Sequence, residues 1–126
     1  MSETGTARDY KDLLVWQKGI RLVSLIYRLT KSFPSDEKFG FTSQMRRAAV
    51  SIPSNIAEGQ ARHTTGSFIQ FISNAEGSVA ELDTQLIIAQ ELSLCSQADT
   101  QEIFGLITEI RRMLNGLRRK LLSNQQ

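Results

Sequence analysis

The stretch RRAAVSIPSNIAEG, residues 46–59, decides how this chain folds and what it can contact. Counted from Met45, which directly precedes the stretch, apolar residues recur at steps of four, three and four at Ala49, Ile52 and Ile56, which predicts a helix with one buried face. A proline at position 53 removes a backbone donor and costs a helix interior about 3 kcal/mol. We therefore expect a helix that is kinked near Pro53. A simple bend, or a break into two helices near Ser51, are the alternatives.

The same helix carries a second row of residues with little polar surface, Val50, Pro53 and Ala57. A helix in a monomeric bundle needs only one apolar arc. The second row predicts a second neighbour, and we interpret it as an oligomer interface that the kink helps to shape. A polar stripe runs between the two rows and consists of Arg47, Ser51, Asn55, Glu58 and Arg62. The short side chains Ser51, Ser54 and Asn55 can satisfy backbone groups freed by the proline.

Three other segments repeat the helical spacing, which predicts helices near residues 12–32, 66–93 and 98–122 beside one at 41–61. The first seam consists of Leu13, Trp16, Ile20, Val23 and Tyr27, widened by Leu22, Ile26 and Leu29. The third consists of Phe68, Ile72, Ala75, Val79, Leu82, Leu86 and Ala89. The fourth consists of Ile103, Ile107, Ile110, Leu114, Leu117 and Leu121.

The connections between these segments are short, which favours antiparallel neighbours. Thr64 or Thr65, and Ser96 or Asp99, are suited to cap the helices that follow them. The predicted fold class is all-α, an antiparallel up-down-up-down four-helix bundle. We expect one domain over residues 1–126, with mobile ends at about 1–8 and 124–126.

The composition of the chain bears on disulfide bonding and on cellular location. The chain has 126 residues and one cysteine, Cys95, so no disulfide framework is expected. We interpret Cys95 as a small, at least half-buried hydrophobe rather than a nucleophile. Neither a signal peptide nor a run of about 18 apolar residues is present, which predicts a cytoplasmic protein without a membrane partner.

Catalytic chemistry finds no support in the residues. His63 is the only histidine, so a His-rich metal site is excluded and a Ser-His-acid triad would have to be built around this one imidazole. No nucleophile elbow and no glycine-rich phosphate loop occurs. We interpret His63 as a solvated loop residue, with phosphate contact as the alternative. The prediction is a non-enzymatic protein with no catalytic, cofactor-binding or metal site and no cofactor.

Charge is unevenly distributed although the net charge is only +2. Residues 64–95 contain four carboxylates and neither lysine nor arginine, whereas cations crowd the C-terminal helix at Arg111, Arg112, Arg118, Arg119 and Lys120. A solvated face is one interpretation of this cluster. Nucleic-acid contact, or ion pairs with the acidic helix of a neighbouring copy, are the others.

Two long stretches carry a family resemblance. They are DLLVWQKGIRLVSLIYRLTKSFPSDEKFGFTSQMRRAAVSIPSNIAEGQAR and SFIQFISNAEGSVAELDTQLIIAQEL, within residues 12–92. This part closely resembles the proteins encoded by intervening sequences of bacterial 23S ribosomal RNA genes, sometimes misnamed S23 ribosomal proteins. The last helix is similar only in pattern.

The resemblance implies a four-helix bundle that assembles into a ring, a pentamer in known relatives. It also implies a distant likeness to the accessory protein of diversity-generating retroelements, which binds reverse transcriptase and nucleic acid. We therefore expect a homo-oligomeric interaction scaffold whose main partner is itself. Weak, sequence-independent binding of RNA or DNA by a basic ring, or of a nucleic-acid-handling protein, is the alternative function.

Overall fold

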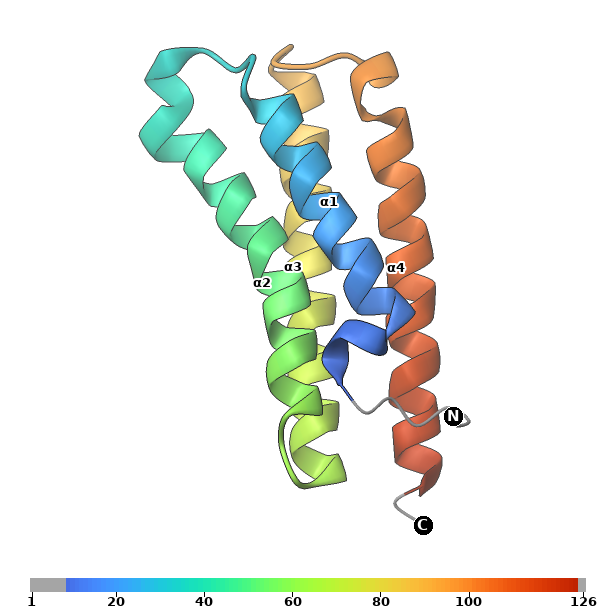
Figure 1. The fold of residues 1–126 in the computed structure, drawn as a ribbon. Coiled ribbons are helices and arrows are strands. Elements are labelled where there is room, and N and C mark those ends of the chain that lie inside the picture. The colour runs from blue at the N-terminus through green and yellow to red at the C-terminus, as the bar shows by residue number, and fades with distance from the viewer. Residues whose placement is uncertain (1–8, 125–126) are drawn as a thin grey trace.

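The computed structural model describes residues 9–124, and these form four long helices without a strand. The helices are α1 (Leu14–Thr30), α2 (Ser43–Gln60), α3 (Thr65–Glu91) and α4 (Gln97–Asn124). They lie side by side, and consecutive helices run in opposite directions (Figure 1). The all-α bundle expected from the four periodic segments is thereby confirmed. Of the ends predicted to be mobile, residues 1–8 and 125–126 lie outside the described part, and Asn124 ends α4.

The antiparallel register of α3 and α4 can be followed in two ion pairs. Arg111 lies 3.6 Å from Asp83, and Arg118, seven residues further along α4, lies 3.0 Å from Glu76, seven residues back along α3. Equal and opposite steps of two helical turns require helices that run in opposite directions. The α1–α4 pair behaves similarly, because Lys18 contacts Glu109 while Arg21 contacts Glu102.

The core lies between the four helices, and three of the four predicted seams supply it. Met45, Ala49, Ile52 and Ile56 of α2 have no exposed surface. The predicted α3 residues are buried except Phe68, which packs against the core from its edge. On α4 the last two seam residues, Leu117 and Leu121, are only partly buried.

The seam predicted for α1 is correct only in part, because Leu22, Ile26 and Leu29 are buried as expected but its central row is not. Ile20 and Tyr27 are 45% and 41% exposed, and Trp16 and Val23 only border the core. The residues that enter the core are Val15, Leu22, Leu25, Ile26 and Leu29. Helix α1 therefore has two apolar rows at helical spacing, and the packing partners decide which of them faces inward.

Helix α2 continues through Pro53 without a break, so its division into two helices is excluded. The proline ring faces α1 at Gly19, where an added Cβ would lie 3.3 Å from the Cβ of Pro53. The absent side chain at position 19 lets the ring pack closely against α1. The kink itself stays a prediction.

Polar side chains cap the starts of α3 and α4, and short turns connect α1 to α2. Thr64 caps α3 by accepting a hydrogen bond from Ser67 N at 3.2 Å. Before α4, Ser96 and Asp99 form a reciprocal pair, because each side chain accepts from the other residue's backbone N–H at 3.1 and 3.0 Å. Between α1 and α2, the segment expected as a loop instead contains a 3₁₀ turn, Ser35–Glu37, and a π-helical turn, Lys38–Thr42. This connection displays Phe39, which is 89% exposed.

Candidate interaction surfaces

An open groove lies on the outside of the bundle where α1, the π-helical turn and α2 meet. We call it the α1–α2 groove. Its apolar lining comes from Tyr27, Phe39 and Val50, and its cations are Lys38, Arg46 and Arg47. No carboxylate lines it, and none of the three cations makes an ion pair with another described residue. The groove thus combines apolar side chains with positive charge at its rim.

Arg46 shapes this groove by fixing Tyr27. Its guanidinium carbon lies 4.4 Å from the centroid of the Tyr27 ring, and its Nε donates to Thr30 Oγ1 at 2.8 Å. Thr30 in turn donates to the Ile26 carbonyl at 2.8 Å. A cation stacked on an aromatic face, with its donors engaged, holds both side chains in one arrangement. The exposed tyrosine is therefore presented by a rigid support.

Two residues of the groove, Tyr27 and Val50, belong with Ile20 and Ala57 to a set of outward apolar residues on the two helices, which we call the α1–α2 outer face. Ile20 and Tyr27 are one heptad apart and therefore share a side of α1. Val50 is 41% exposed, and Ala57 is partly buried. The placement of Pro53 in this outward row is wrong, because Pro53 is buried inside the chain against Gly19. An interface role for Val50 and Ala57 stays a prediction.

The polar stripe predicted on α2 borders α3 and makes only short-range contacts. Ser51 donates to the Ala48 carbonyl and Asn55 to the Ser51 carbonyl, each at 2.7 Å. Arg62 lies 3.3 Å from Glu58, and its guanidinium stacks over the Phe71 ring at 4.8 Å. Arg47 takes no part in these contacts, and both Arg47 and Ser51 line the α1–α2 groove. The stripe thus lacks any convergent group that could perform chemistry.

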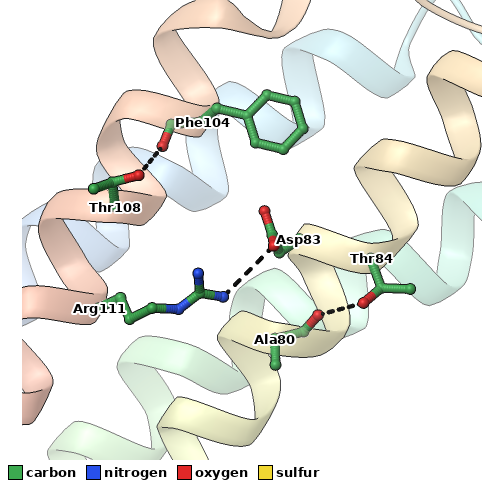
Figure 2. Close-up of polar contacts among 6 residues, drawn as sticks. All are labelled: Ala80, Asp83, Thr84, Phe104, Thr108 and Arg111. Carbon is green, nitrogen blue, oxygen red and sulfur yellow. Dashed lines mark hydrogen bonds and ion pairs between the residues drawn. The ribbon is translucent and has the colours of Figure 1, made fainter.

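The basic cluster of α4 contains two arginines that form ion pairs with α3 and three cations that do not. Figure 2 shows Arg111 reaching across to Asp83 on the neighbouring α3, and Arg118 makes the equivalent contact with Glu76. Arg118 also donates to Asn115 Oδ1 at 2.9 Å. These two arginines are therefore engaged within the chain. Arg112, Arg119 and Lys120 are exposed and form no ion pair with a described residue.

Other titratable groups give no sign of a catalytic site. His63 is exposed in the connection between α2 and α3. Partial burial raises the pKa of the Cys95 thiol above its ordinary value of 9.0, with a smaller contribution from the Asp99 charge. A raised pKa is the opposite of what a reactive thiolate needs. Within residues 9–124 no cluster of three or more potential metal ligands occurs.

A chain of four antiparallel helices, with an apolar outer face and no clustered chemistry in its described part, defines a helical-bundle protein. No described helix is long and apolar enough to cross a membrane. The chain belongs to the 23S rRNA-intervening sequence protein family, whose pattern it matches over residues 11–116. The match extends into α4, beyond the stretches that carried the resemblance. The likeness to the retroelement accessory protein stays a prediction. No curated protein matches the sequence.

Sequence reasoning missed two groups of the groove, Tyr27 and Phe39. Tyr27 was assigned to the core because its spacing fits a seam. Phe39 lies in a segment without periodicity, yet KFGF places two aromatic residues around a glycine beside a lysine, in a segment otherwise rich in polar residues. Aromatic side chains in a connection are a usable signal for a contact surface.

Proposed function

We propose that this protein is a non-enzymatic interaction scaffold that assembles with copies of itself through the α1–α2 outer face. The single observation that carries the proposal is the second apolar row on both α1 and α2. Ile20, Tyr27 and Val50 are each at least 41% exposed although each sits at helical spacing. Tyr27 and Val50 lie together in the groove, and large apolar side chains gathered on a surface are typical of contact sites.

The energetic argument concerns what assembly would remove from water. Burial of apolar surface stabilises by about 25 cal/mol per Å², so covering several half-exposed large side chains contributes a few kcal/mol per contact. A ring repeats that contact at each subunit boundary. Five subunits follow from the family resemblance alone, and the number is part of the proposal.

Ion pairs within the chain reduce the acidic surface that α3 could offer to the cations of another copy. Glu76 and Asp83 are paired with Arg118 and Arg111 of the same chain. Assembly therefore rests on the apolar face, with charge in a secondary role at the rim of the groove.

The experiment is sedimentation equilibrium at micromolar concentration with two matched variants. Val50→Glu places a charge in the proposed contact, where its desolvation is costly. Leu122→Glu is the control, because Leu122 is also 41% exposed but lies at the far end of α4. We expect Val50→Glu to dissociate the assembly and Leu122→Glu to leave it intact, with both retaining wild-type helicity by circular dichroism. A wild-type monomer near 14 kDa would overturn the proposal.

Nucleic-acid binding remains the second candidate because Arg112, Arg119 and Lys120 are exposed on α4 without ion-pair partners among the described residues. Ring symmetry would multiply these three charges. Arg112 and Arg119 are seven residues apart and share one side of the helix, whereas Lys120 points elsewhere. This division favours the scaffold over a continuous cationic band.

A further inference from the structure

We infer that the α1–α2 groove binds the outer end of α3 in a second copy of the chain, so that assembly joins two unlike surfaces. This inference rests on the proposed function and names the surface that completes it. The receiving copy contributes Tyr27, Phe39 and Val50 with the cations around them. The incoming copy contributes an apolar and acidic surface that we call the outer α3 patch: Ile87, Ile88, Glu91 and Leu92.

The outer α3 patch combines apolar side chains with the negative charge that the groove lacks. Ile87, Ile88 and Leu92 are 50%, 40% and 59% exposed, a concentration of large apolar side chains within six residues. Glu91 is exposed among them and makes no ion pair with a described residue. The nearest cation along the chain is far away, because residues 64–95 contain no lysine or arginine. The patch is therefore apolar with a negative rim.

The groove carries a protruding aromatic ring, and an open hollow lies beside the patch. Phe39 protrudes from the connection between α1 and α2, with the Lys38 ammonium 5.5 Å from its ring centroid. Beside the patch lies an open hollow lined by Ile87, Gln90, Glu91, Cys95, Ser96 and Gln97. A protruding ring with a cation beside it suits an open hollow whose lining includes Ile87 and the unpaired carboxylate of Glu91.

The chain itself carries, among its described residues, an unpaired negative charge that matches the cations of the groove, which favours a second copy as the partner. Of the carboxylates on α3, Glu76 and Asp83 are engaged by α4, and Glu81 lies 3.4 Å from Gln85 Nε2. Glu91 is the one left unengaged, and it lies within the only cluster of exposed large apolar residues on that helix among those described. The cations of the groove are likewise unpaired. Each surface thus carries the charge that the other lacks.

A contact between unlike surfaces has a defined consequence for symmetry. When a patch on one copy binds a different patch on the next, every subunit keeps one free surface of each kind until the chain of contacts closes. The α1–α2 and α3–α4 connections lie at the same end of the bundle (Figure 1), and the groove includes residues of the first connection while the patch leads into the second. Successive copies therefore meet at the same end, which favours closure into a ring over a filament that climbs along the bundle axis.

The test mixes two disabled variants and measures mass by light scattering after size-exclusion chromatography. Val50→Glu removes the groove and Ile87→Glu removes the patch. Each variant alone should be monomeric, and an equimolar mixture should give a heterodimer that grows no further, because each partner retains one working surface. Circular dichroism of each variant controls for folding. Leu122→Glu should assemble like wild type.

The outcomes separate this inference from the proposed function. If Val50→Glu is monomeric while Ile87→Glu assembles like wild type, the self-assembling face stands and the outer α3 patch is wrong. If neither variant loses assembly, both ideas are overturned. If both are monomeric but their mixture stays monomeric, the two surfaces do not meet each other and the inference fails.

A charge exchange provides the second measurement, since it does not depend on apolar packing. Arg47→Glu and Glu91→Lys should each weaken assembly at least about 10-fold, because each places like charges at the rim. The double variant restores opposite charges across the contact and should recover most of that loss. Recovery should diminish as salt screens the pair. A double variant that assembles no better than the two single ones would overturn the inference.

Discussion

Gly59 of α2 lies so close to Phe71 of α3 that a Cβ added at position 59 would stand 2.7 Å from the Cβ of Phe71. The Phe68 ring is also near, with its Cδ1 at 2.9 Å from the same point. A ring can rotate away, but the Cβ of Phe71 is held by the backbone of α3. Gly59 therefore sets the distance between α2 and α3 at the end of the quoted stretch.

The first prediction concerns this contact. Gly59→Ala should lower the free energy of unfolding by about 1–3 kcal/mol, because the two helices must separate to admit the methyl group. Gly77→Ala is the matched control, since Gly77 lies within α3 and has no atom within 4 Å of an added Cβ. It should stabilise by up to about 1 kcal/mol through helix propensity. Urea denaturation measures both, and equal effects would contradict the close contact.

The second prediction concerns the ion pair between Arg118 and Glu76. Both side chains are partly shielded, so a double-mutant cycle with Arg118→Met and Glu76→Gln should give a coupling of about 0.5–1 kcal/mol. The pair of Arg111 and Asp83 is longer at 3.6 Å and should give less. Molar salt should reduce both couplings. A coupling near zero for the first pair would mean that its arrangement contributes nothing to α3–α4 packing.

The third prediction concerns acid stability at the start of α4. The pKa of Asp99 is lowered from its ordinary value of 3.8, first by the backbone N–H of Ser96 and then by the Ser96 side chain. A lowered pKa contributes stability above the ordinary value, and this contribution is lost as the pH falls through the folded pKa. Asp99→Asn should therefore remove part of the loss of stability below about pH 4.

Ser96→Ala separates the two causes of that shift. The backbone N–H remains in the variant, so the pKa of Asp99 should rise only partway toward 3.8, as measured by NMR titration. A complete return to 3.8 would show that the hydroxyl, rather than the backbone, holds the carboxylate. Urea midpoints measured from pH 2 to 7 should therefore fall less steeply in acid for Ser96→Ala than for wild type, and least steeply for Asp99→Asn.

The fourth prediction distinguishes the scaffold from a nucleic-acid-binding ring. Arg112, Arg119 and Lys120, all changed to Glu, test the cations that remain unpaired. The scaffold predicts no binding of labelled RNA or DNA by wild type at about 50 mM salt. If wild type binds and the triple variant does not, with a log–log salt slope near −0.7 to −0.9 per contact, the alternative function replaces the proposal.

The sequence predicts the helices well because their apolar residues keep a helical period over many turns. It fails on α1, where two apolar rows satisfy the same period and only the neighbouring helices decide between Leu22 and Ile20. It fails on Pro53 for a related reason. A proline on a helix surface and a proline against a glycine of another helix have the same local sequence, and the partner Gly19 is distant in the chain.

The interhelical ion pairs show a second limit. The separate charges of α3 and α4 are evident in the sequence, but whether they meet within one chain depends on the axial register of the two helices. Neither segment alone determines that register. The groove is harder still, since Tyr27 and Phe39 come from different elements and meet only when the connection folds into its π-helical turn.

The seven-residue spacing of Arg111 and Arg118 against Asp83 and Glu76 restricts how α4 can slide along α3. A slip by one turn, about 5.4 Å, would move both arginines away from their carboxylates. A slip by two turns would instead bring Arg111 opposite Glu76 in one direction, or Arg118 opposite Asp83 in the other, so that one new pair could form. The ion pairs therefore disfavour a slip of one turn but not a slip of two turns. Residues 92–96, fully extended, could still reach across the farther slip, so the loss of apolar contacts at the ends of both helices is what opposes it.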